Sequence, residues 1–317
     1  MWNKLAKDKE ISVLCPGYFL ECLLLPLVAA ILKINKFFIK QFIVPKYYHG
    51  MLKEFDLDVG YGDIINPIIE YDRLNEARDA FPAPIFFDAD KNVYLNLLFN
   101  YGKKIPASGI EAPEWVEQIS PSQRNEPPFW RQILNNLCMG HNAVFPKLNY
   151  EWARETANQY LRGSGIKGNG RYVLMDNPCL FGLAADKRII EPQYYFPIQI
   201  KEIADYLKRQ KIELVIMSND AGEYRKLGLN NIIPSWANIN SELVLALLGS
   251  ACGVISWDQN IYLSAALLDV KSIVCLDDPP MGWRFDDVIA LTREEKGNWV
   301  IADKNKSLLQ IIGEIWR

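Results

Sequence analysis

Short apolar runs of strand length alternate with longer helical patterns along most of this chain of 317 residues, and no other feature restricts its fold as strongly. Strands that alternate with helices form right-handed βαβ units, so the pattern predicts a mainly parallel sheet covered by helices. The predicted strands are residues 11–15, 41–45, 82–89, 171–178, 212–220, 252–257 and 272–276. The predicted helices are residues 23–34, 47–55, 127–140, 149–162, 197–210, 240–251, 259–269 and 305–317.

The alternation restarts after a glycine-rich stretch at residues 163–170, which is typical of a linker between domains. The length of the chain also favours two domains over one. We therefore predict an α/β fold with two facing doubly wound domains, residues 1–165 and 166–300, followed by a C-terminal helix at 301–317. Ligands of such sheets bind at the carboxyl ends of the strands, so we expect a binding cleft between the domains.

The composition argues against several classes of protein. The formal net charge of −3 does not suit a dedicated electrostatic binder of nucleic acids. Two histidines leave little room for histidine-based metal sites or catalytic triads. The six cysteines include no Cys-x-x-Cys pair, so neither a zinc site nor a disulfide framework is indicated, and reduced thiols favour a cytoplasmic protein. The sequence also lacks P-loop, Gly-x-Gly-x-x-Gly and His-Glu-x-x-His motifs.

The apolar run at residues 11–34 is long enough to raise the alternative of a membrane span. Pro16 and Gly17 interrupt it after a short strand-like piece, and Pro26 lies within the remainder. Glu21 also lies inside it, and a charge in hydrocarbon costs about 3 kcal/mol on insertion scales. We therefore interpret this run as a buried strand, a loop and a buried helix.

Polar residues follow several predicted strands, where a doubly wound sheet binds its ligands. They are Gly17 and Glu21, Asp88 and Asp90, Asp176 and Asn177, Ser218 and Asn219, and Asp258, Gln259 and Asn260 after Trp257. The last group also begins a helix, where free backbone N–H groups attract anions such as phosphate. An Asp at this position can equally be an N-cap without a ligand, so both interpretations stay open at this stage.

Residues 244–276 resemble the signature of the bacterial heptosyltransferase family, the lipopolysaccharide enzymes of the GT-B class of glycosyltransferases. That signature consists of a helix, a strand, Asp-Ser-Gly-x-x-His-x-Ala-x-Ala and a strand led by Pro. Asp258 and Ala265 match it. The departures are Gln259 for Ser, Asn260 for Gly, Leu263 for His and Lys271 for Pro.

Three further segments, 13–31, 82–110 and 196–223, are similar to the family's opening strand and helix, its Asp-bearing strand, and its Trp-Pro-led helix with the strand that follows. The order of elements therefore matches over nearly the whole chain. The resemblance implies a GT-B fold of two Rossmann-like domains. It also implies inverting, metal-independent transfer of a sugar from a nucleotide sugar, which is a substrate, so that no cofactor is needed.

In the family, the C-terminal domain binds the nucleotide sugar, and the resemblance places the donor's phosphates at Asp258, Gln259 and Asn260. Lys187 and Arg188 are the cations nearest to the family Lys that meets a phosphate, although they can also belong to a solvated loop. The other residues expected at the donor site are Trp257, Asn177, Ser218, Asn219 and Gly17. A strand-end tryptophan can equally pack beneath a loop.

The N-terminal domain of the family binds the acceptor and supplies an acidic base. Glu21 lies one residue beyond the matching position, as judged by spacing to Pro26, and a carboxylate in an apolar run is suited to take a proton from the acceptor hydroxyl. The structural alternative is a Glu in the first turn of a helix, where the dipole favours it. Asp90, together with Asp88, is the reserve for the catalytic base.

The acceptor stays open between a lipopolysaccharide or other surface glycan, a glycolipid and DNA. Lys33, Lys36 and Lys40 lie among phenylalanines and suit either contact with the inner face of a membrane or a helix end with solvated lysines. Three alternative functions also fit the architecture: a phage-type DNA-base glycosyltransferase, a non-catalytic GT-B-like binding protein and a nucleotide-sugar epimerase.

Overall fold

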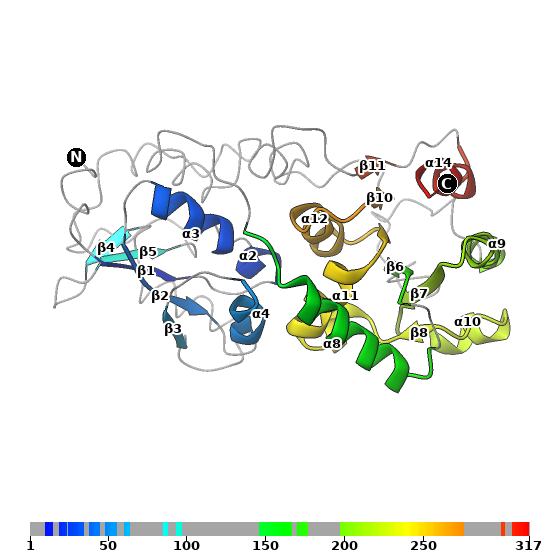
Figure 1. The fold of residues 1–317 in the computed structure, drawn as a ribbon, viewed down its shortest axis with the longest axis horizontal. Coiled ribbons are helices and arrows are strands. Elements are labelled where there is room, and N and C mark those ends of the chain that lie inside the picture. The colour runs from blue at the N-terminus through cyan, green and yellow to red at the C-terminus, as the bar shows by residue number, and fades with distance from the viewer. Residues whose placement is uncertain are drawn as a thin grey trace, which may run out of the picture. The chain divides into compact units, whose positions relative to one another are not determined.

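The computed structural model describes residues 10–14, 19–23, 25–34, 38–44, 48–55, 60–63, 85–87, 93–96, 146–166, 170–176, 197–275, 299–301 and 306–316. These residues fall into two compact units, the first ending at Pro146 and the second beginning at Lys147. Each unit contains a parallel or mainly parallel sheet accompanied by helices, so the predicted α/β class is confirmed (Figure 1).

The first unit holds a five-stranded sheet among its described residues, with strand order β3-β2-β1-β5-β4. Its elements are β1 (Glu10–Leu14), α2 (Phe19–Leu23), α3 (Leu25–Ile34), β2 (Phe38–Val44), α4 (His49–Lys53), β3 (Gly60–Asp63), β4 (Ile85–Phe87) and β5 (Val93–Asn96). All neighbouring strands are parallel except β4, which is antiparallel to β5. Because the strand order reverses between β1 and β5, the carboxyl end of β1 is the switch point of this sheet.

The apolar run at residues 11–34 folds as the strand β1 followed by the helices α2 and α3, which confirms the interpretation as buried secondary structure. Ile11 and Val13 of β1 are buried, as are Val28 and Leu32 of α3. The α3 helix has only 10 residues, and a membrane-spanning helix needs about 20. No helix among the described residues is both long and apolar enough to cross a membrane.

The second unit holds a six-stranded, fully parallel sheet among its described residues, in the order β11-β10-β9-β6-β7-β8. Its elements are α8 (Tyr150–Gly163), β6 (Tyr172–Asp176), α9 (Pro197–Arg209), β7 (Glu213–Met217), α10 (Ala221–Lys226), β8 (Ile232–Ile233), the 3-10 turn η3 (Trp236–Asn238), α11 (Ser241–Ser250), β9 (Gly253–Ser256), α12 (Gln259–Leu267), β10 (Ser272–Val274), β11 (Trp299–Ile301) and α14 (Leu308–Ile315). The chain runs from β6 outward to β8 and then returns to β9 on the other side of β6. The strands β6 and β9 therefore form the switch point of this sheet.

The structure places the division between the units earlier than the predicted boundary at residues 165 and 166. Helix α8 belongs to the second unit, where it packs on α11. The contact is close, because a Cβ atom added at Gly249 would overlap the Leu148 side chain. The buried face of α8 thus ties it to the second sheet.

The glycine-rich stretch is correspondingly not the interdomain linker that its composition predicts. Gly165 has a φ of 78° and ends α8 in a Schellman motif. The Ile166 N–H donates to the Leu161 carbonyl at 2.9 Å, and the Gly165 N–H donates to the Arg162 carbonyl at 3.0 Å. The left-handed conformation is the reason for glycine at this position.

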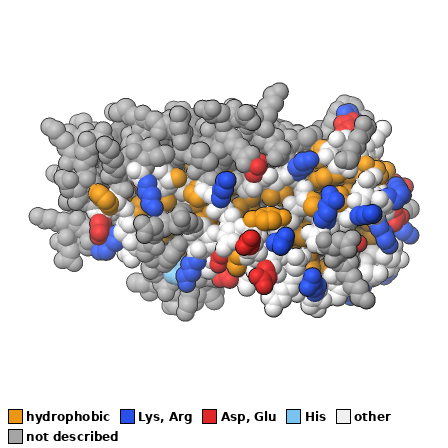
Figure 2. Space-filling view, in the orientation of Figure 1, with side chains coloured by type: hydrophobic (Ala, Val, Ile, Leu, Met, Phe, Trp, Pro, Cys, Tyr) orange, Lys and Arg blue, Asp and Glu red, His pale blue; other side chains and the backbone are white. Residues whose placement is uncertain are grey.

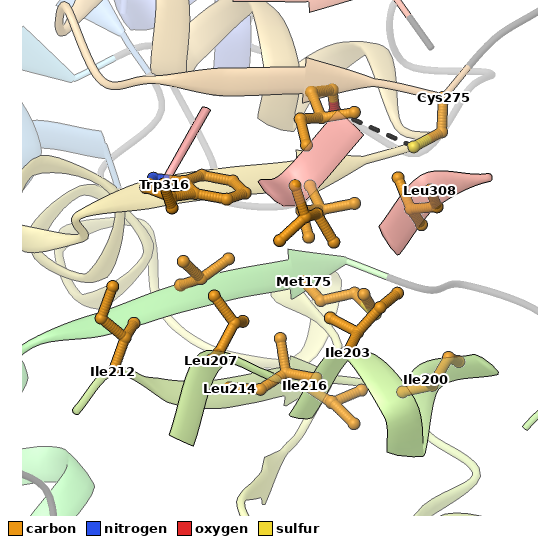
Figure 3. Packing of buried hydrophobic residues seen from close by; sticks show 14 of the residues in the cluster. Met175, Ile200, Ile203, Leu207, Ile212, Leu214, Ile216, Cys275, Leu308 and Trp316 are labelled. Atoms are coloured by element: carbon orange, nitrogen blue, oxygen red, sulfur yellow. Dashed lines mark hydrogen bonds between the residues drawn. The ribbon is translucent and has the colours of Figure 1, made fainter. Parts of the chain in front are cut away.

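A hydrophobic cluster from β6, β7, β9, β10, α9 and α14 forms the core on one face of the second sheet (Figure 3). Trp316 lies just after α14 and packs directly on the backbone of β9. Its Nε1 donates to the Cys252 carbonyl at 3.3 Å. A Cβ atom added at Gly253 would overlap the indole ring of Trp316 and lie 2.6 Å from its Cε2 atom. Glycine at this position therefore lets the C-terminal helix dock against the strand that leads to the switch point.

We expect Gly253→Ala to destabilise the protein by roughly 1–3 kcal/mol, because the added methyl group overpacks the site under Trp316. The matched control is Gly222→Ala in α10, where a Cβ atom meets nothing within 4 Å. This control should stabilise the protein slightly, by up to about 1 kcal/mol, because alanine favours a helix over glycine. Urea unfolding of both variants measures the difference, and equal stability of the two would contradict the described packing.

Candidate functional site

The carboxyl ends of β6 and β9 bring polar residues together at the switch point of the second sheet. Asp176, the last residue of β6, is paired in the parallel ladder with Ser256, the last residue of β9. On its other side, Asp176 is paired with Met217 of β7. Asp258 follows two residues after β9 and begins α12. The ends of parallel strands at a switch point are where doubly wound proteins bind ligands.

Asp176 is fully buried, with a relative exposure of 0%. Its Oδ2 atom lies 3.4 Å from the Ser256 hydroxyl oxygen, whereas its Oδ1 atom has no hydrogen-bond partner among the described residues. Burial raises the pKa of the Asp176 carboxyl to about 8, and the nearby Asp258 carboxylate adds to the rise. The raised pKa favours the neutral form of the Asp176 carboxyl, which can donate as well as accept a hydrogen bond.

Asp258 is the N-cap of α12, which confirms the capping interpretation of this residue. Its Oδ1 atom accepts from the Asn260 backbone N–H at 2.7 Å and from the Asn260 side-chain amide at 3.1 Å. Its Oδ2 atom accepts from Trp236 Nε1 at 3.1 Å. Its own N–H donates to the Ser256 hydroxyl at 3.0 Å. Both oxygens of the Asp258 carboxylate are thus already hydrogen-bonded within the chain.

The 3-10 turn η3 is held at both ends by residues from neighbouring strand ends. Asn219, two residues after β7, accepts through Oδ1 from the Asn238 amide at 2.8 Å and from the Ser235 N–H at 3.4 Å. Trp236, the first residue of the turn, is half-buried and donates to Asp258. The turn is therefore fixed to β7 on one side and to the start of α12 on the other.

Three other residues expected at the donor site lie within the described part of the chain, namely Ser218, Trp257 and Gln259. Ser218 is buried just after β7, and its hydroxyl accepts from the Asp220 N–H at 3.1 Å. Trp257 packs against the hydrophobic cluster of the second unit, which agrees with the packing alternative for this residue. Gln259 is the first residue of α12. Any role of these residues in ligand binding stays a prediction.

Sequence reasoning did not identify Trp236, Ser256 or Tyr262 as members of this site. Tyr262 is buried on α12, and burial together with the Asp258 carboxylate raises the pKa of its hydroxyl. A strand-end position was a usable signal for Ser256. Trp236 gave no signal, because its contact with Asp258 joins residues 22 positions apart and depends on the tertiary fold.

Six of the sequence-predicted site residues lie outside the described part of the chain: Gly17, Asp88, Asp90, Asn177, Lys187 and Arg188. Glu21 lies in α2, which follows β1 at the switch point of the first sheet. Strand β4 is antiparallel to β5, and its last residue, Phe87, pairs with Val93 at the start of β5. The end of β4 therefore lies at the amino edge of the sheet, not at the carboxyl edge expected for a ligand site.

No group of three or more His, Cys, Asp or Glu residues that could hold a metal ion occurs within the described ranges.

No protein-family model matches the chain, and no curated protein matches it in sequence. Several solved structures share its fold. A glycosyl transferase family 9 protein from Veillonella parvula is 13% identical, with a TM-score of 0.54, over 96% of this chain and 91% of that one. ADP-heptose lipopolysaccharide heptosyltransferase II from E. coli is 12% identical, with a TM-score of 0.56, over 97% and 98%. An E. coli heptosyltransferase solved with ADP is 14% identical, with a TM-score of 0.52, over 96% and 97%. The predicted GT-B fold is thereby confirmed.

The buried Asp176 carboxyl predicts a pH dependence of stability. Its pKa is about 8 in the folded protein and near 3.8 in the unfolded chain, so the folded state binds the proton more tightly. The stabilisation from this proton is complete below about pH 4 and is lost as the pH rises to about 8, with a slope approaching 1.4 kcal/mol per pH unit. We expect Asp176→Asn to remove this component of the slope, as measured by urea unfolding between pH 5 and pH 9.

The matched control is Asp205→Asn, which makes the same change at an exposed position on α9. It should keep the pH slope of the wild type. A wild-type slope in Asp176→Asn would mean that Asp176 ionises as an ordinary surface carboxylate.

Proposed function

We propose that the protein is a glycosyltransferase that moves a sugar from a nucleoside-diphosphate donor to a hydroxyl group of a glycan acceptor. The observation that carries this proposal is the fold, which matches heptosyltransferases along 96–97% of the chain. The polar residues at the β6/β9 switch point add to it, because they lie where a doubly wound domain binds a ligand. One of the matched E. coli enzymes is named for an ADP-heptose substrate, and another was solved with ADP.

The donor binds to the second unit in this proposal. Lys187 and Arg188 precede α9 in the chain, and their charges would stabilise the nucleoside diphosphate as it leaves. No metal ion is needed where protein cations carry out this task. A hexose or heptose is the proposed transferred sugar, by analogy with the proteins that share the fold.

The first unit would bind the acceptor and supply the base. Glu21 lies in α2, just after β1 and thus near the switch point of the first sheet. Its carboxylate would take the proton from the acceptor hydroxyl while the hydroxyl oxygen attacks the anomeric carbon. The bond from that carbon to the donor phosphate breaks in the same step, and the nucleoside diphosphate leaves with the electron pair. Attack from the opposite face inverts the anomeric carbon.

A glycan or glycolipid is a better acceptor than DNA on electrostatic grounds. On the face shown in Figure 2, the Lys and Arg side chains of the described residues are interspersed with Asp and Glu. A DNA-binding surface instead gathers cations along the path of the phosphates. The net charge of −3 points the same way. Lipopolysaccharide core oligosaccharides are therefore the first acceptors to test.

We expect at least one nucleotide or nucleotide sugar to stabilise the protein against heat. A ligand at 100 times its Kd should add about 2.7 kcal/mol to the free energy of unfolding. Differential scanning fluorimetry with ADP, GDP, UDP, CMP and their sugars makes the measurement. If none of these raises the melting temperature, the proposal of a nucleotide-sugar enzyme is wrong, and a non-catalytic role of the fold is favoured.

We expect Glu21→Gln to lower kcat by roughly 10²–10⁴-fold, the usual contribution of a general base, while the Kd of the donor stays unchanged. Sugar transfer to lipopolysaccharide core oligosaccharides, followed by mass spectrometry, measures the rate. The matched control is Glu10→Gln at the exposed, amino end of β1, which should leave kcat unchanged. Wild-type turnover by Glu21→Gln would exclude Glu21 as the base.

A further inference from the structure

The described residues at the β6/β9 switch point supply carboxyl groups rather than the cations or unbonded N–H donors that bind an anion. We call Asp176, Ser256, Asp258 and Trp236 the strand-end site. Two of these four residues carry carboxyl groups, and the Asp258 carboxylate contributes to the raised pKa of Asp176. A diphosphate placed against them would meet at least one negative charge at close range, and like charges repel strongly in a partly buried site.

The start of α12 does little to offset this repulsion. Asp258 takes the Asn260 backbone N–H with its own side chain, and the Ile261 and Tyr262 N–H groups donate to the Asp258 carbonyl at 3.1 and 3.0 Å. Most of the N–H groups that a phosphate would use at a helix N-terminus are therefore engaged within the chain. The Asp258 carboxylate itself already occupies the favourable end of the helix dipole.

We propose that the strand-end site binds a hydroxylated ring of the donor, either the ribose or the transferred sugar, and that the diphosphate lies away from it. This inference rests on the proposed function, since it concerns how the same donor is oriented. It departs from the phosphate role that the family resemblance implies for Asp258, Gln259 and Asn260.

The chemistry of the strand-end site matches a sugar ring in three respects. The Asp176 Oδ1 atom is buried and has no hydrogen-bond partner within the described ranges, so a ligand hydroxyl could donate to it. A carboxylate such as Asp258 accepts hydroxyl protons through lone pairs that remain after its present bonds, since its two oxygens offer about four acceptor positions. Trp236 is an aromatic ring fixed in place by Asp258, and a flat apolar face of this kind packs on the C–H groups of a sugar.

The charge change in Asp258→Asn separates the two orientations by the sign of its effect. If the site holds a hydroxylated ring, loss of the carboxylate weakens binding by about tenfold or more, the range expected for a hydrogen bond to a charged group. If the site holds the diphosphate, removal of a repelling charge tightens binding or leaves it unchanged. Asn remains a good N-cap, so the variant keeps the helix start. Isothermal titration with ADP, GDP, UDP, ADP-heptose, GDP-mannose and UDP-glucose makes the comparison.

The matched control is Asp269→Asn, which removes the same charge at the other end of α12. Asp269 has a φ of 62°, a conformation that asparagine also tolerates. The control should bind each probe as the wild type does. Trp236→Phe, which keeps an aromatic face, should retain most of the affinity, whereas Trp236→Ala should lose about tenfold, within the range for loss of a stacking contact.

Bare nucleotides and nucleotide sugars identify which ring is bound. If the ring is the ribose, Asp258→Asn weakens ADP, GDP or UDP as much as the corresponding sugar nucleotide, and the 2′- or 3′-deoxynucleotide of the same base binds weakly to the wild type. If the ring is the transferred sugar, the loss appears only with the nucleotide sugar. Either result supports the proposal.

Tighter or equal binding of every probe by Asp258→Asn, nucleotide sugars included, with wild-type binding intact, overturns the orientation and leaves the glycosyltransferase proposal standing. Unchanged affinity in Trp236→Ala likewise overturns the stacking role of that ring. The absence of wild-type binding to every probe overturns the proposed function itself, and the orientation with it.

Discussion

The parallel pairing of β6 with β9 is the constraint on which the rest of the second unit depends. It joins residues 80 positions apart and sets Asp176 beside Ser256 at the end of the sheet. Because β7 pairs with β6 on its other side, the Asp176 backbone is paired on both edges, and its side chain is buried. The strand order reverses at the same point. The buried acid therefore lies at the strand ends where doubly wound sheets generally bind their ligands.

The residue at position 260 affects which hydrogen-bond donors the start of α12 offers to a ligand. In the heptosyltransferase signature, a Gly follows the Asp and Ser, whereas this chain has Asn260. The described non-glycine residues with positive φ are Lys211 and Asp269, so Asn260 is an ordinary helical residue and carries no penalty for a side chain. Its amide and its N–H both donate to Asp258. The substitution thus gives the cap a second donor and leaves less of the helix end available to an anion.

The sequence was sufficient for most of the fold, and it was least informative where structure depends on partners distant in the chain. The alternation of apolar runs predicts β6, β7, β9 and β10 with the helices between them, because a buried parallel strand is apolar on both faces. The strands β8 and β11 were not predicted, and β8, with two residues, is too short to stand out as an apolar run. The antiparallel direction of β4 is decided by its pairing with β5, and the domain boundary by the packing of α8 on α11. Asp258 was predictable as a helix start, but the bond from Trp236 that gives it a second role was not.

The unpartnered oxygen of Asp176 is the feature that packing alone explains least well. A buried polar atom without a hydrogen bond costs about 1–3 kcal/mol, and a core residue such as Val or Leu at the end of β6 would avoid that cost. Ser218 and Ser256 lie at the neighbouring strand ends. The Ser218 hydroxyl accepts from the Asp220 N–H, and the Ser256 hydroxyl donates to the Asp258 carbonyl, so both form hydrogen bonds with residues close in the chain. Among the described residues, the Asp176 Oδ1 atom has no such partner. Departures from consistent packing concentrate at functional sites. A buried polar atom that lowers stability in the free protein is therefore expected where a bound ligand supplies its hydrogen bond. Under the orientation proposed above, a hydroxyl group of the donor would be that partner, because it can both donate and accept a hydrogen bond.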